Sequence, residues 1–239
     1  MQSGMRKIIF VLLAVAALAF IAGYLLAPRG ALLTAVPGVY SVKLALPAVD
    51  SYGRGALAEL TVEAASGEAG VYYQVDDQNP LVNPETQESL KTAVAVAREV
   101  TGMQDKRLFY SISAPSQVVG GHSAGAALAV ATTAALSNSK IKQGYLVTGT
   151  VEADGSIGRV GEILAKAQAA KDAGYSVLLV PVGEAVYDAP RQNCTEERTP
   201  TGLFKTCVTL YETAGVTNET GMQVVEVASV RQAFGLMRQ

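Results

Sequence analysis

Apolar and polar positions along the chain predict an apolar N-terminal segment followed by strands and helices. Residues 57–64 alternate between two faces, one of them apolar, which is typical of a strand with one buried side. A turn at 67–70 predicts that the apolar run 71–75 pairs back on this strand as a hairpin. Later apolar runs predict four further strands, at 108–113, 145–151, 177–180 and 224–227.

Helical patterns account for most of the segments between these strands. We expect helices at 84–100, 126–136 and 161–173, and a last one that ends near Met237. Asn83 can cap the first helix, because its side chain accepts a hydrogen bond from a free backbone N–H group. Strands and helices in this order indicate a mixed α/β (α+β) fold. With 49% apolar residues among 239, the chain can bury one sizeable core, so we expect one globular domain.

The N-terminal segment from Ile8 to Ala27 contains no charged residue. About 20 apolar residues suffice to cross the hydrocarbon core of a membrane, so we interpret this segment as a transmembrane helix. A cleaved signal peptide is the alternative interpretation. Its apolar region is usually shorter, however, and the residues around Ala27 and Pro28 lack the small-x-small cleavage pattern.

Charges beside this segment predict how the chain is oriented in the membrane. Two basic residues and the terminal amine precede the segment, whereas only Arg29 follows it closely. Because positive charge favours the cytoplasmic side, we expect the N-terminus in the cytoplasm. The expected single-pass protein of the cell membrane then has four parts: a cytoplasmic end at 1–7, a span in membrane lipid at 8–27, a tether at 28–42 and an extracytoplasmic domain at 43–239.

Composition narrows the possible partners. The 19 basic and 21 acidic residues give a formal charge of −2, without a basic run or interleaved aromatic residues, so we expect no binding to nucleic acid. Cys194 and Cys207 can form a disulfide in an oxidising compartment, or remain two unpaired apolar residues. They lack the spacing of a metal site, so we expect no metal.

Small residues surround a serine in the sequence Gly-Gly-His-Ser-Ala-Gly at 120–125. Ser123 stands just before a helix that we expect to begin near Ala124. Free N–H groups at a helix start can stabilise a developing oxyanion, and the glycines allow a substrate backbone to approach. Ser123 is therefore a candidate nucleophile. The alternative is that it serves only as the N-cap of the helix.

A nucleophilic serine needs a base, and histidine is a poor candidate here. The single histidine, His122, is adjacent to Ser123, and side chains of neighbouring residues generally diverge, so a Ser-His-Asp triad is not expected. A lysine in apolar surroundings is the other recognised base, because burial favours its neutral amine. Lys166 shares an apolar helix face with Ile163 and Ala170, so it is the candidate base.

Four short motifs occur in order between residues 120 and 181. They are a serine signature, a Thr-Gly pair, a glycine-bearing turn and a lysine: Ser123-Ala124-Gly125, Thr148-Gly149, Gly158-Arg159-Val160-Gly161 and Lys166. With these motifs and their spacing, the segment resembles the proteolytic domain of Lon-type (S16) serine peptidases, which use a Ser-Lys dyad. Residues 53–55, 60–63 and 87–89 resemble the opening hairpin and first helix of that family, so the resemblance covers most of 43–239.

The resemblance implies a role for each candidate residue. Ser123 attacks the scissile carbonyl, Lys166 takes its proton and Thr148 orients the lysine. Gly121 and neighbouring backbone amides contact the oxyanion, with His122 as a further supporting residue. The implied function is a membrane-anchored serine endopeptidase that hydrolyses unfolded or extended polypeptides. The implied assembly is a homo-oligomer, which in that family is commonly a hexamer.

In the Lon family, an ATPase domain usually accompanies the proteolytic domain. The phosphate-binding pattern G-x-x-x-x-G-K-[ST] does not occur in this sequence. We therefore expect ATP-independent proteolysis without a cofactor. An ATPase on a separate partner chain is the remaining alternative.

Some residues depart from the pattern that the resemblance implies. Gly120, His122 and Thr150 stand where many relatives carry Asp, Pro and Glu. These departures favour an alternative function, a catalytically weak or inactive Lon-fold scaffold that is tethered to the membrane and binds other proteins. Residues 183–221, which include both cysteines, resemble an insertion relative to the shorter version of the family.

Overall fold

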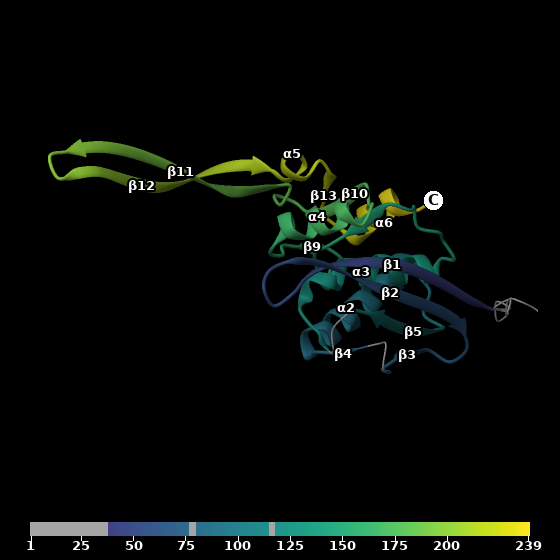
Figure 1. The fold of residues 1–239 in the computed structure, drawn as a ribbon. Coiled ribbons are helices and arrows are strands. Elements are labelled where there is room, and N and C mark those ends of the chain that lie inside the picture. The colour runs from purple at the N-terminus through teal and green to yellow at the C-terminus, as the bar shows by residue number, and fades with distance from the viewer. Residues whose placement is uncertain (1–37, 77–79, 115–117) are drawn as a thin grey trace, which may run out of the picture. The chain divides into compact units, whose positions relative to one another are not determined.

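The computed structural model describes residues 38–76, 80–114 and 118–239, and residues 38–239 form one compact unit. The unit has the mixed α/β fold that the sequence predicts (Figure 1). The predicted span at 8–27 lies outside the described residues. Among the helices that are described, none has the length and apolar character needed to cross a membrane.

A mixed four-stranded sheet forms one layer of the domain. Its strands, in spatial order, are β1 (Val39–Val49), β2 (Gly55–Ser66), β5 (Lys106–Ser113) and β3 (Gly70–Tyr73). β1, β2 and β5 are antiparallel neighbours, whereas β3 runs parallel to β5. The alternation along β2 is confirmed, because Leu60 and Val62 are fully buried while Glu59 is exposed.

Two predictions about this sheet are wrong. β1 begins at Val39, inside the segment expected to be a tether at 28–42, because the strand pairs with β2 along its whole length. The hairpin expected from 71–75 does not form, since β3 pairs with β5 and not with β2. β5 has 8 residues against 4 in β3, and it buries large side chains such as Leu108 and Tyr110, so it is the better partner for β2.

The predicted helices occur close to their expected positions. α2 (Pro84–Thr101) begins at the predicted cap, where the side chain of Asn83 accepts a hydrogen bond from the Thr86 N–H at 2.9 Å. α3 (Gly125–Leu136) is buried along its whole length between α2, β1, β2 and α6 (Val230–Met237). A helix that is apolar on all sides has to be surrounded in this way, and its alanines allow neighbours to approach closely. The main core therefore surrounds α3.

A smaller parallel sheet lies next to this core. Its spatial order is β13 (Gln223–Val227), β10 (Val177–Pro181) and β7 (Tyr145–Val147), and α4 (Ile163–Asp172) packs against it. β10 and β13 confirm the strands expected at 177–180 and 224–227.

The single strand expected at 145–151 is wrong, because the chain turns at Gly149. The segment forms β7 and then β8 (Thr150–Val151), which pairs with β9 (Ile157–Gly158) in an antiparallel ladder. Gly149 has a φ of 150°, and a Cβ at this position would collide with the side chain of Ile157. Only glycine fits this turn.

Residues 183–221, which look like an insertion, contain a long hairpin that extends beyond the sheets and helices of the domain (Figure 1). β11 (Val186–Thr199) pairs with β12 (Gly202–Gly215), and the short helix α5 (Val216–Thr220) returns the chain to β13. Cys194 and Cys207 face each other across the hairpin with their Cα atoms 4.1 Å apart, and their sulfurs form a disulfide. Of the two possibilities for the cysteines, the structure therefore shows the bridged one.

Candidate active site

Ser123 lies in a short 3-10 turn, η1 (His122–Ala124), that leads directly into α3. Its side chain is half-buried. Its backbone carbonyl accepts hydrogen bonds from the Thr148 Oγ1 hydroxyl at 3.2 Å and from the Gly149 N–H at 3.1 Å. The connection between β7 and β8 thus holds the serine in place. Thr148, which the resemblance places beside the lysine, here donates to the backbone of the serine instead.

The other side of the serine loop is held by the start of α2. The Thr86 hydroxyl donates a hydrogen bond to the Gly121 carbonyl at 3.2 Å. Gly121 has a φ of 99°, a left-handed conformation that favours glycine. Apart from its two chain neighbours, no residue of the described chain has an atom within 4 Å of where its Cβ would be. The loop is therefore open on this side, which leaves room for a substrate backbone.

His122 points toward α2. Its Nε2 atom lies 4.0 Å from a carboxylate oxygen of Glu88, and its side chain is 48% exposed. Among the described residues, no hydrogen bond joins His122 to Ser123. This geometry agrees with the prediction that the side chains of these neighbouring residues diverge.

Gly120 explains one departure from the family pattern. A Cβ at this position would lie 2.7 Å from the side-chain nitrogen of Asn83, the N-cap of α2. Because Asn83 occupies this space, an aspartate could not stand at position 120 without moving the cap. The close approach of the loop to the Asn83 side chain therefore favours glycine here.

Lys166 lies on the inner face of α4 and is only 2% exposed. Burial lowers the pKa of its amine, while the charges of Glu184 and Glu162 partly oppose that shift. Within the described part of the chain, its amine has neither a hydrogen bond nor an ion pair. Lys171 on the same helix differs, because it is exposed and donates to the Gly221 carbonyl at 3.0 Å.

Close packing of α4 on the first sheet accounts for this burial. A Cβ on Gly55, at the start of β2, would collide with the backbone carbonyl of Ala165. The strand therefore approaches the helix next to Lys166 more closely than any other residue type would allow. On its opposite side, α4 buries Ala167 and Ala170 against Leu146 and other residues of the smaller sheet.

Glu184 is a candidate residue that the sequence pattern did not indicate. Its side chain is 7% exposed, and its carboxylate accepts hydrogen bonds from the Val160 N–H at 3.1 Å and from Arg159 Nε at 3.2 Å. It thereby holds the glycine-bearing turn that precedes α4. In the sequence it appears only as a single acid between small residues at the start of the apparent insertion, so no periodic signal marks it.

A groove of 490 Å³ borders this turn and the base of the long hairpin. Its lining includes Arg159, Glu184 and Leu164 from the body of the domain, and Val186 and Tyr187 from β11. The apparent insertion therefore contributes to a groove beside the helix that carries Lys166.

No hydrogen bond links the two dyad candidates, Ser123 and Lys166, to each other in the part of the chain that the structure describes. The Thr148 hydroxyl donates to the Ser123 carbonyl. Catalytic hydrogen bonds are often long in unliganded enzymes and shorten in complexes with substrate. In the described residues, no group of three or more His, Cys, Asp or Glu side chains gathers as metal ligands would.

Part of the chain matches a known protein family. Residues 86–192, less than half of the chain, match the model of the Lon protease (S16) C-terminal proteolytic domain. The matched segment includes Ser123, Thr148 and Lys166 and ends within β11. At the level of the family, the match supports a serine-type peptidase. No curated protein sequence matches the chain.

Proposed function

We propose that the chain is a serine endopeptidase in which Ser123 is the nucleophile and Lys166 the general base. The observation that carries this proposal is a lysine only 2% exposed, with no ion pair among the described residues, inside a segment that matches a peptidase domain. Burying an amine is costly, and burial shifts it toward its neutral form. A neutral amine is the form that accepts a proton from serine.

The proposed reaction has two stages. Ser123 Oγ attacks the carbonyl carbon of the scissile peptide bond while its proton passes to the Lys166 amine. The tetrahedral intermediate then expels the amine half of the substrate, which takes that proton from Lys166, and leaves an acyl ester on Ser123. A water molecule hydrolyses the ester with Lys166 again as base. Backbone N–H groups of the loop from Gly121 to Ser123 stabilise the oxyanion, since the first two N–H groups of α3 already donate to the carbonyls of His122 and Gly149.

The proposed substrates are unfolded or extended polypeptides. The open space beside Gly121 admits a peptide backbone, and extended chains expose their carbonyls to attack. We propose that hydrolysis does not require ATP, since the sequence has no phosphate-binding motif. An ATPase partner chain is the alternative.

The proposed setting is the cell membrane. Residues 8–27 anchor the chain in lipid, residues 1–7 face the cytoplasm and the peptidase domain lies outside, as the flanking charges favour. By resemblance to the family, the domain forms a homo-oligomer. Light scattering on the full-length protein in detergent should then give a protein mass, without the bound detergent, above that of one chain.

Cleavage of an unfolded protein such as casein tests the proposed reaction. Ser123→Ala removes the nucleophile and Lys166→Gln removes the base at similar volume, so each should lower turnover by roughly 10⁴- to 10⁶-fold. The matched control is Lys171→Gln, whose lysine is exposed and should be nearly silent. Normal cleavage by Ser123→Ala would contradict the proposal.

A further inference from the structure

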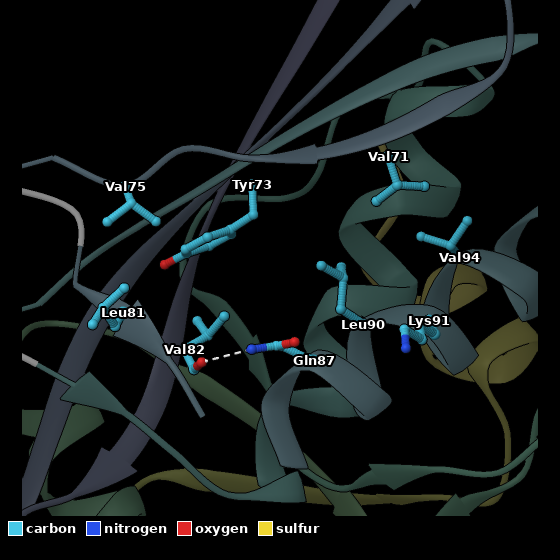
Figure 2. Close-up of a pocket in the computed structure, with 9 residues that line it drawn as sticks. All are labelled: Val71, Tyr73, Val75, Leu81, Val82, Gln87, Leu90, Lys91 and Val94. Carbon is cyan, nitrogen blue, oxygen red and sulfur yellow. Dashed lines mark hydrogen bonds between the residues drawn. The ribbon is translucent and has the colours of Figure 1, made fainter. Parts of the chain in front are cut away.

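An apolar groove of 460 Å³ lies between β3, the N-terminal half of α2 and β4 (Leu81–Val82) (Figure 2). Val71 and Tyr73 line it from β3, and Leu90 and Val94 line it from α2. Several of its apolar side chains remain accessible to solvent, with Val71 44% exposed and Leu81 58% exposed. Contiguous exposed apolar surface in a soluble domain typically marks a binding site.

The polar groups of the groove are already bonded within the domain. The Tyr73 hydroxyl donates to the Pro80 carbonyl at 2.8 Å. The Gln87 amide donates to the Val82 carbonyl at 3.1 Å (Figure 2). Among the lining residues, Lys91 is the one that carries a charge. The groove therefore offers apolar surface to a ligand and disfavours a basic group.

Two of the elements that line the groove, β4 and α2, also contact the segment that leads to Ser123. β4 forms a short parallel ladder with β6 (Val118–Val119), and Gly120 directly follows β6. On the other wall, α2 contacts the loop through the hydrogen bond from Thr86 to the Gly121 carbonyl. Both walls thus lead from the groove to the residues just before Ser123.

The rise of α2 gives an estimate of how far the groove lies from the serine loop. Leu90 and Val94 lie about 6 Å and 12 Å further along α2 than Thr86, at about 1.5 Å per residue. An extended polypeptide covers about 3.3 Å per residue. Counted from Thr86, where α2 contacts the serine loop, the groove therefore lies roughly two to four residues of extended chain away.

We propose that this groove binds an apolar side chain of the polypeptide substrate, a few residues away from the bond that is cut. The inference rests on the proposed peptidase function and adds a selection rule to it. Segments with leucine, phenylalanine or a similar residue at that position are cleaved preferentially, and segments with lysine or arginine there are cleaved poorly because of Lys91.

The test uses quenched fluorescent peptides of about twelve residues, long enough at about 3.3 Å per residue to span loop and groove. Each carries leucine, serine or lysine at one position, two to four residues on either side of the cut. The wild-type protein should prefer leucine to serine at one of these positions by about 10- to 100-fold in kcat/KM, which corresponds to burial of one apolar side chain. Peptides too short to reach the groove should show no such preference.

Val71→Arg places a charge in the groove and should remove the preference, chiefly by raising KM for the leucine peptide. The matched control is Val208→Arg, because Val208 is 56% exposed on a strand outside the groove, and it should behave as wild type. If Val71→Arg fails to fold, Leu81→Ser at a 58% exposed position replaces it.

Binding provides a readout that does not depend on turnover. Fluorescence anisotropy with the Ser123→Ala protein should show tighter binding of the leucine peptide than of the serine peptide, and Ser123→Ala/Val71→Arg should abolish the difference. If Val71→Arg changes neither selectivity nor binding, the groove inference is wrong while the peptidase proposal stands. If Val71→Arg changes only the oligomeric state, the groove is a contact between copies of the chain, and this result would also overturn the groove inference. If Ser123→Ala cleaves normally, the proposed function itself fails.

Discussion

The Lys166 side chain is almost fully buried, and this burial predicts how peptide cleavage depends on pH. The base is active when neutral, so cleavage should be low at acidic pH and rise as Lys166 loses its proton. Because burial lowers the pKa of Lys166, the half-maximal point should lie below the pKa of an exposed lysine. The measurement is kcat/KM for a peptide substrate as a function of pH. A limb near neutrality that disappears in His122→Ala would show that histidine is the base.

Glu184 offers a second test of whether Lys166 is the general base. Its negative charge raises the pKa of Lys166, so Glu184→Gln should move the half-maximal pH downward. The matched control is Glu226→Gln, whose carboxylate accepts a hydrogen bond from the Ala185 N–H at 3.2 Å but is not among the charges that act on Lys166. Identical pH profiles for Glu184→Gln and wild type would contradict the proposed role of Lys166.

At the residue scale, the sequence was informative where local chemistry is unusual. A serine among glycines at a helix start and a lysine on an apolar helix face are both visible without a structure, as is the cap at Asn83. Glu184 was missed, because its importance comes from hydrogen bonds to a turn 24 and 25 residues away. A lone acid in the sequence does not indicate such partners.

At the scale of elements, the sequence predicts which segments form helices and strands better than it predicts which strands pair. The alternation in β2 and the helical patterns of α2 and α3 identified these elements, because each pattern reports local burial. The partner of β3 was predicted wrongly, since strand pairing depends on which distant segment buries more surface. The break between β7 and β8 was missed because a single glycine conformation causes it.

The disulfide in the long hairpin leads to a prediction about this element alone. An isolated two-stranded ribbon is only marginally stable, and a disulfide that closes a short loop contributes about 3 kcal/mol. Replacing Cys194 and Cys207 by alanine, in the Ser123→Ala background, should speed tryptic cleavage within the hairpin by about 10- to 100-fold. Midpoint temperatures of thermal unfolding should change little, because the bridge joins β11 and β12 only to each other.

The control for this experiment is the neighbouring pair, Thr195 and Thr206, which face each other across the same strands. Replacing both by alanine should leave tryptic cleavage close to wild type. If the cysteine variant resists trypsin as well as the control does, the disulfide is not what orders the hairpin.

At the scale of the whole molecule, the proposed topology has a direct consequence. If residues 8–27 anchor the chain with the N-terminus in the cytoplasm, protease added to intact spheroplasts should degrade the domain. A cytoplasmic marker protein in the same sample should remain intact. Protection of the domain until the membrane is lysed would place it in the cytoplasm and contradict the topology.

The central claim is that Ser123 is a nucleophile activated by Lys166, and covalent labelling measures this most directly. The full-length protein in detergent is treated with a serine-directed phosphonylating probe, and the modified residue is identified by mass spectrometry of peptides. We expect one adduct, on Ser123, that forms much more slowly in Lys166→Gln and at the wild-type rate in Lys171→Gln and His122→Ala. Failure to label Ser123, or equal labelling in Lys166→Gln, would contradict the account.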